Sequence, residues 1–252
     1  MAELTQIVSF LDSYLKIDEI DDSSWNGLQF EGGKEVEKII LAVDAGEETF
    51  ELAVRESAQL IIVHHGHFWK SSDPSIKGWA VKRLEILFNN GISLYACHLP
   101  FDRHPEIGNN ALLIKLLGAE IDGEFLHIGD KNIGWQGKFK SPKDLNEIVK
   151  ALGDELNAEC VVLPFGKPEV STVAVCSGGG GYDGFYEALA SGADLYLTGD
   201  SIEVFHTAKD AGLNVIFAGH HATEIIGIKA LAEPLEKNFR VEAVFFDLPT
   251  GL

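Results

Sequence analysis

The chain has 252 residues, of which 46% are hydrophobic and 23% are charged, so it can bury a substantial core as one large domain or two closely joined ones. Its formal charge of -19 disfavours nucleic acid as a partner, and no cluster of Lys and Arg interleaved with aromatic residues makes a local exception. Because no apolar run approaches the length of a membrane span and residues 1–4 do not resemble a signal peptide, we expect no membrane association and a cytoplasmic location.

Helices and strands alternate along the chain, which predicts an α/β fold. Apolar residues at helical spacing predict helices, and short apolar runs bounded by Gly, Asp or Asn predict buried strands. In the first half we expect helices at 4–11, 47–57 and 79–89 and strands at 38–43, 60–63 and 92–96. In the middle we expect strands at 133–139 and 160–163 and a helix that opens near Pro142. In the second half we expect strands at 172–175, 195–198 and 213–217 and helices at 182–190, 202–211 and 222–235.

The two halves of the chain repeat one strand and helix pattern. Residues 42–46 match 174–178, residues 57–62 match 192–197, and residues 91–96 match 212–217. We therefore predict two similar, intertwined α/β subdomains that arose by internal duplication, with sheets flanked by helices and an approximate boundary between 1–125 and 126–252. A coincidental α/β rhythm is the alternative explanation.

Histidines and carboxylates stand at matching places in the two copies. His64 and His65 follow the strand at 60–63, and His98 precedes Asp102 by four residues. In the second copy, Asp200 follows the strand at 195–198, and His220 precedes Glu224 by four residues. Open α/β sheets gather ligands at the carboxyl ends of their strands, and imidazole with carboxylate suits zinc, iron, manganese or nickel better than calcium. We predict one dinuclear metal site shared by the halves, although any single histidine can instead be a surface or hydrogen-bonded core residue.

The spacing within these clusters leads to three further expectations. Adjacent side chains of an extended strand point to opposite sides, so His64 and His65 are expected to serve one ion each, with Gly66 allowing the chain to turn. Glu224 lies on the same face as His220 if the last helix starts there, and it is a natural bridging carboxylate. Pro100 favours a loop between His98 and Asp102.

Other motifs allow more than one interpretation. Ser177 to Gly181 lies between a strand and a helix, where its amides can cradle a phosphate, but a flexible turn is favoured because the lysine of a P-loop is missing. Trp25 to Gln29 either positions a substrate through Asn26 and Gln29 or is a turn anchored by a buried tryptophan. Asp44 and Asp200 end strands near the expected site and are assigned orienting roles at most. The three cysteines lack CxxC spacing and are expected to be reduced thiols.

Five ordered motifs resemble those of one protein family. They are Trp25 to Gln29, Ile62 to Gly66, His98 to Asp102, Thr198 to Asp200 with His206, and Gly219 to Glu224. Together they resemble the YbgI-like dinuclear metal proteins, also called GTP cyclohydrolase type 2 homologues or the Ngg-interacting-factor-three-like family. The resemblance implies two similar α/β subdomains and a toroidal homohexamer whose metal sites face an internal cavity. It also implies metal ligands at His64, His65, Asp102, His220 and Glu224, with Glu224 bridging and His98 as a residue behind the ligands or a proton shuttle.

The function that follows is metal-assisted hydrolysis. Two divalent ions per chain are expected to activate a water that attacks the substrate, with His98 as a candidate acid-base catalyst. The resemblance implies GTP cyclohydrolase type 2-like chemistry on a small molecule, nucleotide-like or a cyclic amide, but nothing in the composition or spacing selects GTP. The alternative is a non-catalytic, metal-loaded ring that acts as a scaffold or adaptor.

Overall fold

A computed structural model describes all 252 residues, and these form two compact units. Unit 1 consists of residues 1–101 and 227–248, and unit 2 consists of residues 102–226 and 249–252. Unit 2 thus begins before the boundary expected near residue 125, and each unit contains residues from both halves of the chain. The internal duplication itself stays a prediction. No helix is both long enough and apolar enough to cross a bilayer.

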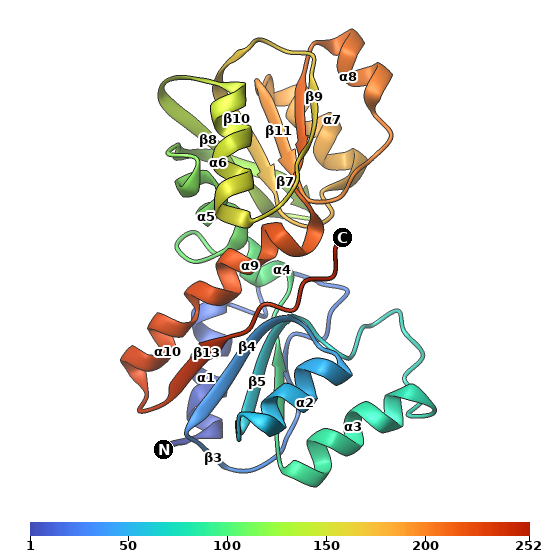
Figure 1. Cartoon of the computed structure of the whole chain (residues 1–252), viewed down its shortest axis with the longest axis vertical. Coiled ribbons are helices and arrows are strands. Elements are labelled where there is room, and N and C mark those ends of the chain that lie inside the picture. The colour runs from blue at the N-terminus through green and yellow to red at the C-terminus, as the bar shows by residue number, and fades with distance from the viewer. The chain divides into compact units, whose positions relative to one another are not determined.

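Unit 1 is a five-stranded sheet with the strand order β13-β4-β5-β6-β2. Strands β13, β4, β5 and β6 are parallel, and only β2 runs antiparallel to its neighbour. Helices α2 and α3 cover one face of the sheet, and α1 and α10 cover the other (Figure 1). The central strands are buried on both faces, which explains why they read as continuous apolar runs.

The helices and strands of unit 1 have the following bounds, with α9 reaching unit 1 from Gly227 onward. They are β1 Ala2–Glu3, α1 Leu4–Leu15, β2 Gly27–Phe30, β3 Glu35–Val36, β4 Lys38–Asp44, α2 Glu47–Arg55, β5 Leu60–His65, α3 Trp79–Asn90, β6 Ser93–Ala96, α9 His220–Ala230, α10 Ala232–Asn238 and β13 Glu242–Phe245.

Unit 2 is a six-stranded sheet with the strand order β7-β8-β10-β11-β12-β9. Its central strands β10, β11 and β12 are parallel, and the strands on either side of them are antiparallel. Helices α5 and α6 lie on one face of the sheet and α7 and α8 on the other (Figure 1). Leu113 of α5 and Leu152 of α6 belong to the apolar cluster that also contains Val173 and Leu195 of the sheet.

The elements of unit 2 are bounded as follows, with α4 beginning in unit 1. They are α4 Leu99–Asp102, α5 Asn109–Leu116, β7 Glu120–Ile128, β8 Lys131–Asp144, α6 Leu145–Leu156, β9 Val161–Pro164, β10 Glu169–Cys176, α7 Gly181–Ser191, β11 Leu195–Thr198, α8 Phe205–Ala211 and β12 Asn214–Phe217.

The α/β class and most of the expected elements are confirmed, but the elements around three prolines differ from those expected. Pro142 lies inside β8, and α6 begins only after Asp144, whose side chain accepts a hydrogen bond from the amide of Asn146 at 2.8 Å. Pro100 lies in the first turn of α4, where no intrahelical N–H is needed, so residues 99–102 are helical and the expected loop is wrong. Pro234 lies in the first turn of α10, so the single helix expected at 222–235 is two helices.

Candidate metal centre

Three histidines gather at the carboxyl ends of two adjacent parallel strands in unit 1. His64 and His65 are the last two residues of β5, and His98 follows β6 by two positions. One ring nitrogen of each histidine lies within 4.8 Å of those of the other two. These residues are called the histidine cluster below. The parallel pairing of β5 with β6 brings together residues that are 33 positions apart in the chain.

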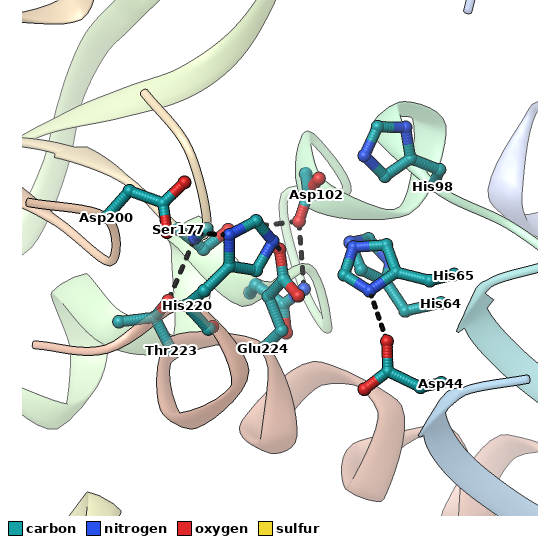
Figure 2. A network of polar contacts seen from close by, with 12 residues as sticks. Asp44, His64, His65, His98, Asp102, Ser177, Asp200, His220, Thr223 and Glu224 are labelled. Atoms are coloured by element: carbon teal, nitrogen blue, oxygen red, sulfur yellow. Dashed lines mark hydrogen bonds and ion pairs between the residues drawn. The ribbon is translucent and has the colours of Figure 1, made fainter. Parts of the chain in front are cut away.

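The rings of His64 and His65 lie side by side, with centroids 4.8 Å apart. The expectation that neighbouring residues of the strand point to opposite sides is therefore wrong here. The two rings are held from different strands: Nδ1 of His64 donates to the carbonyl of Cys97 beyond β6 at 3.0 Å, and Nδ1 of His65 donates to Asp44 at the end of β4 at 2.8 Å. Figure 2 shows the second of these hydrogen bonds. The strand ends here, so alternation no longer controls the direction of the side chains.

His98 is oriented by the loop before β2. Its Nδ1 donates to Oδ1 of Asp22 at 2.9 Å, and its backbone amide donates to the side chain of Asn26 at 2.9 Å. Burial alone raises the pKa of the Asp22 carboxyl, but the hydrogen bonds from His98, Asn26 and the Ser24 amide outweigh it and lower that pKa far below its usual range. Asp22 is therefore an ionised, buried anchor for the imidazole of His98.

A second cluster forms in unit 2 from Asp102, His220 and Glu224, called the carboxylate cluster below. His220 begins α9, so Glu224 lies one turn further on the same face, with its Oε1 at 3.3 Å from Nε2 of His220. Nδ1 of His220 donates to Asp200 at 2.9 Å (Figure 2). Both Asp102 and Glu224 are buried carboxylates, a placement that requires compensating positive charge or hydrogen bonds.

The two residues after β10, Ser177 and Gly178, pack against the carboxylate cluster. The Ser177 hydroxyl donates to Oδ1 of Asp102 at 3.0 Å, and the same oxygen accepts a hydrogen bond from Asn109 at 2.8 Å. At Gly178, which has a φ of +56°, a Cβ would overlap with Oε1 of Glu224 and lie 3.0 Å from Nε2 of His220. The glycine is required both by its backbone conformation and by the close approach of the two candidate ligands.

The charges of the carboxylate cluster favour a cation. The hydrogen bond with Glu224 raises the pKa of His220 to about 9 despite the opposing effect of burial, and Asp200 contributes to the rise. The buried Cys176 thiol lies near Asp102 and Glu224, and burial together with the two negative charges raises its pKa well above the usual value. A bound divalent ion would replace the proton that His220 otherwise carries.

The glycine-rich turn after β10 does not form a phosphate cradle from these amides. The amide of Ser177 donates to Asn110, that of Gly178 to Thr223, and that of Gly180 to Thr198. Because these amides bind side chains of unit 2, the turn serves the packing of the carboxylate cluster. These three amides are therefore not available to a phosphate, and the turn is fixed by hydrogen bonds at these positions.

In the motif from Trp25 to Gln29, the polar side chains of Asn26 and Gln29 hold neighbouring loops in place. Asn26 bridges Asp22 and the amide of His98, while Gln29 accepts from the amides of His67 and Phe68 and donates to two carbonyls. The alternative of a turn anchored by a buried tryptophan is wrong, because 56% of Trp25 is exposed. His206, from another of the motifs, lies exposed on α8 with its ring against Phe205.

Several residues that orient the candidate ligands were missed in the sequence. Asp22, Ser177 and Asn109 bind His98 or Asp102, but they are 76, 75 and 7 positions away from them and belong to no recognisable metal motif. Trp69 was also missed: its ring lies 5.1 Å from that of His98 and 6.0 Å from that of His65. The orienting roles expected for Asp44 and Asp200 agree with their hydrogen bonds to His65 and His220.

The comparisons with known proteins agree with this architecture. A family model described as Duf34/NIF3 (NGG1p interacting factor 3) matches residues 2–250. The chain belongs to the NIF3 family. Two relatives named GTP cyclohydrolase 1 type 2 homolog, from Archaeoglobus fulgidus and Pyrococcus horikoshii, are 40% and 45% identical to it over 99% and 98% of both chains.

Two solved structures have the same fold. A structure titled protein ybgI, of unknown function, matches all of both chains with a TM-score of 0.93 and 37% identity. The protein TTHA1606 from Thermus thermophilus also matches all of both chains, with a TM-score of 0.87 and 40% identity.

The donor set of the two clusters fits divalent metal ions. Because Nδ1 of each of the four histidines binds a carbonyl or a carboxylate, the lone pair of the neutral ring is at Nε2. This pattern, with a carboxylate or carbonyl behind the imidazole, is typical of histidines that bind metal. Imidazole and carboxylate ligands without a thiolate favour zinc, iron, manganese or nickel over calcium or a structural zinc site.

Proposed function

We propose that this member of the NIF3 family binds two divalent metal ions per chain and is a metal-dependent hydrolase. The observation that carries the proposal is the common orientation of the candidate ligands. His65, His98 and His220 each have an aspartate behind Nδ1 at 2.8–2.9 Å, and His64 has a backbone carbonyl there at 3.0 Å. A carbonyl or carboxylate behind Nδ1, which leaves Nε2 to face a ligand, is typical of histidines that bind metal.

The residues that would hold the ions are His64, His65, Asp102, His220 and Glu224. Supporting evidence is that Ser177 and Asn109 both donate to Oδ1 of Asp102, so the orientation of this buried carboxylate is fixed. Five ligands for two ions leave coordination positions for substrate and water, as catalytic sites require.

When bound, the ions would supply a Lewis acid and lower the pKa of a water molecule. The chain would supply orientation and proton transfer. His98 is held through Nδ1 by the ionised Asp22, which stabilises the ring when Nε2 accepts a proton from water or returns it to a leaving group. Asp44 and Asp200 hold the rings of His65 and His220 in the neutral tautomer that presents the lone pair of Nε2.

We propose a nucleotide-like molecule or a cyclic amide as the substrate class. The support is the name that the relatives from Archaeoglobus fulgidus and Pyrococcus horikoshii share, GTP cyclohydrolase 1 type 2 homolog. The test is to load the purified protein with manganese, iron, zinc or nickel and to measure hydrolysis of a panel of nucleotides, phosphoesters and cyclic amides. Glu224→Gln is the control.

Metal-dependent turnover that is abolished by Glu224→Gln would support the hydrolase. Stoichiometric metal without turnover of any substrate in the panel would instead support the alternative, a metal-loaded scaffold or adaptor. The homohexamer is also a proposal. Light scattering coupled to gel filtration tests it, with six times the mass of the chain as the expected result.

A further inference from the structure

The loop that holds His98 also lines a cavity of unit 1 outside the histidine cluster. The cavity has a volume of about 490 Å³, and its walls include Asp18, Asp21, Ser24, Trp25 and Lys70. This volume lies within the range of about 300–1,000 Å³ that is usual for small-molecule sites. Asp22 and Asn26 form a further part of the wall, and these two residues orient His98.

Two features of the cavity point to a ligand. Trp25 is 56% exposed although it belongs to a loop that is tied down by hydrogen bonds, so its ring is available for stacking. Ser24 is only 2% exposed, and its hydroxyl makes no hydrogen bond within the protein. A buried hydroxyl without a partner is costly, and a polar group of a bound molecule would satisfy it.

The charge of the cavity indicates which kind of molecule fits. Two exposed carboxylates, Asp18 and Asp21, line the cavity together with a single cation, Lys70, whereas the carboxylate of Asp22 is bound to His98 and Asn26. The Lys70 ammonium pairs with Asp21 at 2.7 Å and lies 5.7 Å from the centroid of the Trp25 ring. Lys70 thus occupies a position where a positive charge interacts with both the indole of Trp25 and the carboxylate of Asp21.

We propose that this cavity binds a positively charged or amino-bearing planar heterocycle, which stacks on Trp25, pairs with Asp21 and hydrogen-bonds to Ser24. Lys70 competes with this ligand for the indole face and for Asp21. Phosphate and other anions are disfavoured by the carboxylates. The inference does not depend on the proposed hydrolase, because it concerns binding by residues of which none is a proposed metal ligand.

The test is equilibrium dialysis of the full chain with 1-methyladenosine, whose ring is positively charged at neutral pH, and with neutral adenosine. We expect saturable binding of 1-methyladenosine that is at least tenfold tighter than that of adenosine and is unchanged by EDTA. Trp25→Ala should weaken it at least tenfold, and Asp21→Asn should weaken it several-fold. Lys70→Met should strengthen it, because the competing cation is removed.

Trp79→Ala is the matched control. Trp79 is also exposed and has Arg83 over its ring at 5.0 Å, but it does not line this cavity. Its substitution should leave the binding of 1-methyladenosine unchanged. The proposal is overturned if the charged and neutral nucleosides bind equally, if Trp79→Ala weakens binding as much as Trp25→Ala, or if Lys70→Met weakens binding as it would for an anionic ligand.

Discussion

The substitution Gly178→Ala tests whether the turn after β10 is shaped by the candidate metal ligands. Gly178 has a φ of +56°, a conformation that costs an alanine about 1–2 kcal/mol. The reduced entropy of the unfolded chain offsets about 0.4–1 kcal/mol of this. Backbone strain alone should therefore lower the stability by about 1 kcal/mol, a shift in melting temperature of about 2–4 °C for a chain of this size.

The new methyl group has a second effect, because it would overlap with Oε1 of Glu224 and approach Nε2 of His220. Glu224 would have to leave its position, so we expect metal affinity to fall at least 10- to 100-fold, the loss typical of changes behind metal ligands. Affinity is measured by competition with a chelator, and stability is measured by thermal unfolding in EDTA.

Gly181→Ala is the matched control for this experiment. Gly181 has a φ of +59°, almost the same as that of Gly178, but a Cβ there would meet no atom within 4 Å. It should show the same loss of stability without the loss of metal affinity. Our account of the carboxylate cluster is refuted if Gly178→Ala binds metal like the wild type, or if Gly181→Ala loses metal to the same extent.

Three further predictions follow from the structure. Asp44→Asn should lower metal affinity 10- to 100-fold in a chelator titration, because it removes the carboxylate behind His65, whereas Asp73→Asn on an exposed loop should not. Because the pKa of His220 is raised to about 9, metal affinity should increase with pH up to about 9 as the competing proton is lost. In the metal-free protein, the same raised pKa contributes stability that is fully present below pH 6.5 and is lost as the pH rises through 9. If His220→Gln left the pH profiles of metal affinity and of stability unaltered, both predictions would be contradicted. Leu152→Ala in the buried core of unit 2 should cost about 2–5 kcal/mol in denaturant unfolding, and a cost below 1 kcal/mol would refute the described packing.

Local patterns in the sequence predict the elements that carry the clusters. The apolar runs at β4, β5, β10 and β11 are buried on both faces, so they are recognisable without the structure. A helix is expected at 222–235, and the structure places its start two residues earlier, at His220, which puts His220 and Glu224 on one face. Prolines are less informative, because the same residue is tolerated in a helical first turn, as at Pro100, and inside a strand, as at Pro142.

The contacts behind the ligands depend on tertiary structure and could not be predicted. Asp22 reaches His98 across 76 positions, and no periodicity or motif relates these two residues. The exposure of Trp25 was equally hidden, because a tryptophan followed by Asn-Gly fits a buried anchor as well as an exposed ring. The glycines after β10 suggested flexibility, whereas Gly178 is required by the two side chains that approach its Cα.

The central claim, a dinuclear centre, is tested most directly by the metal content of the purified chain. The measurement is elemental analysis by mass spectrometry, combined with native mass spectrometry, on the wild type, His64→Ala and Glu224→Gln. We predict two divalent ions per chain in the wild type and fewer in both variants, with the fold retained. No stoichiometric metal in the wild type, together with an unchanged metal content in His64→Ala, would contradict the account.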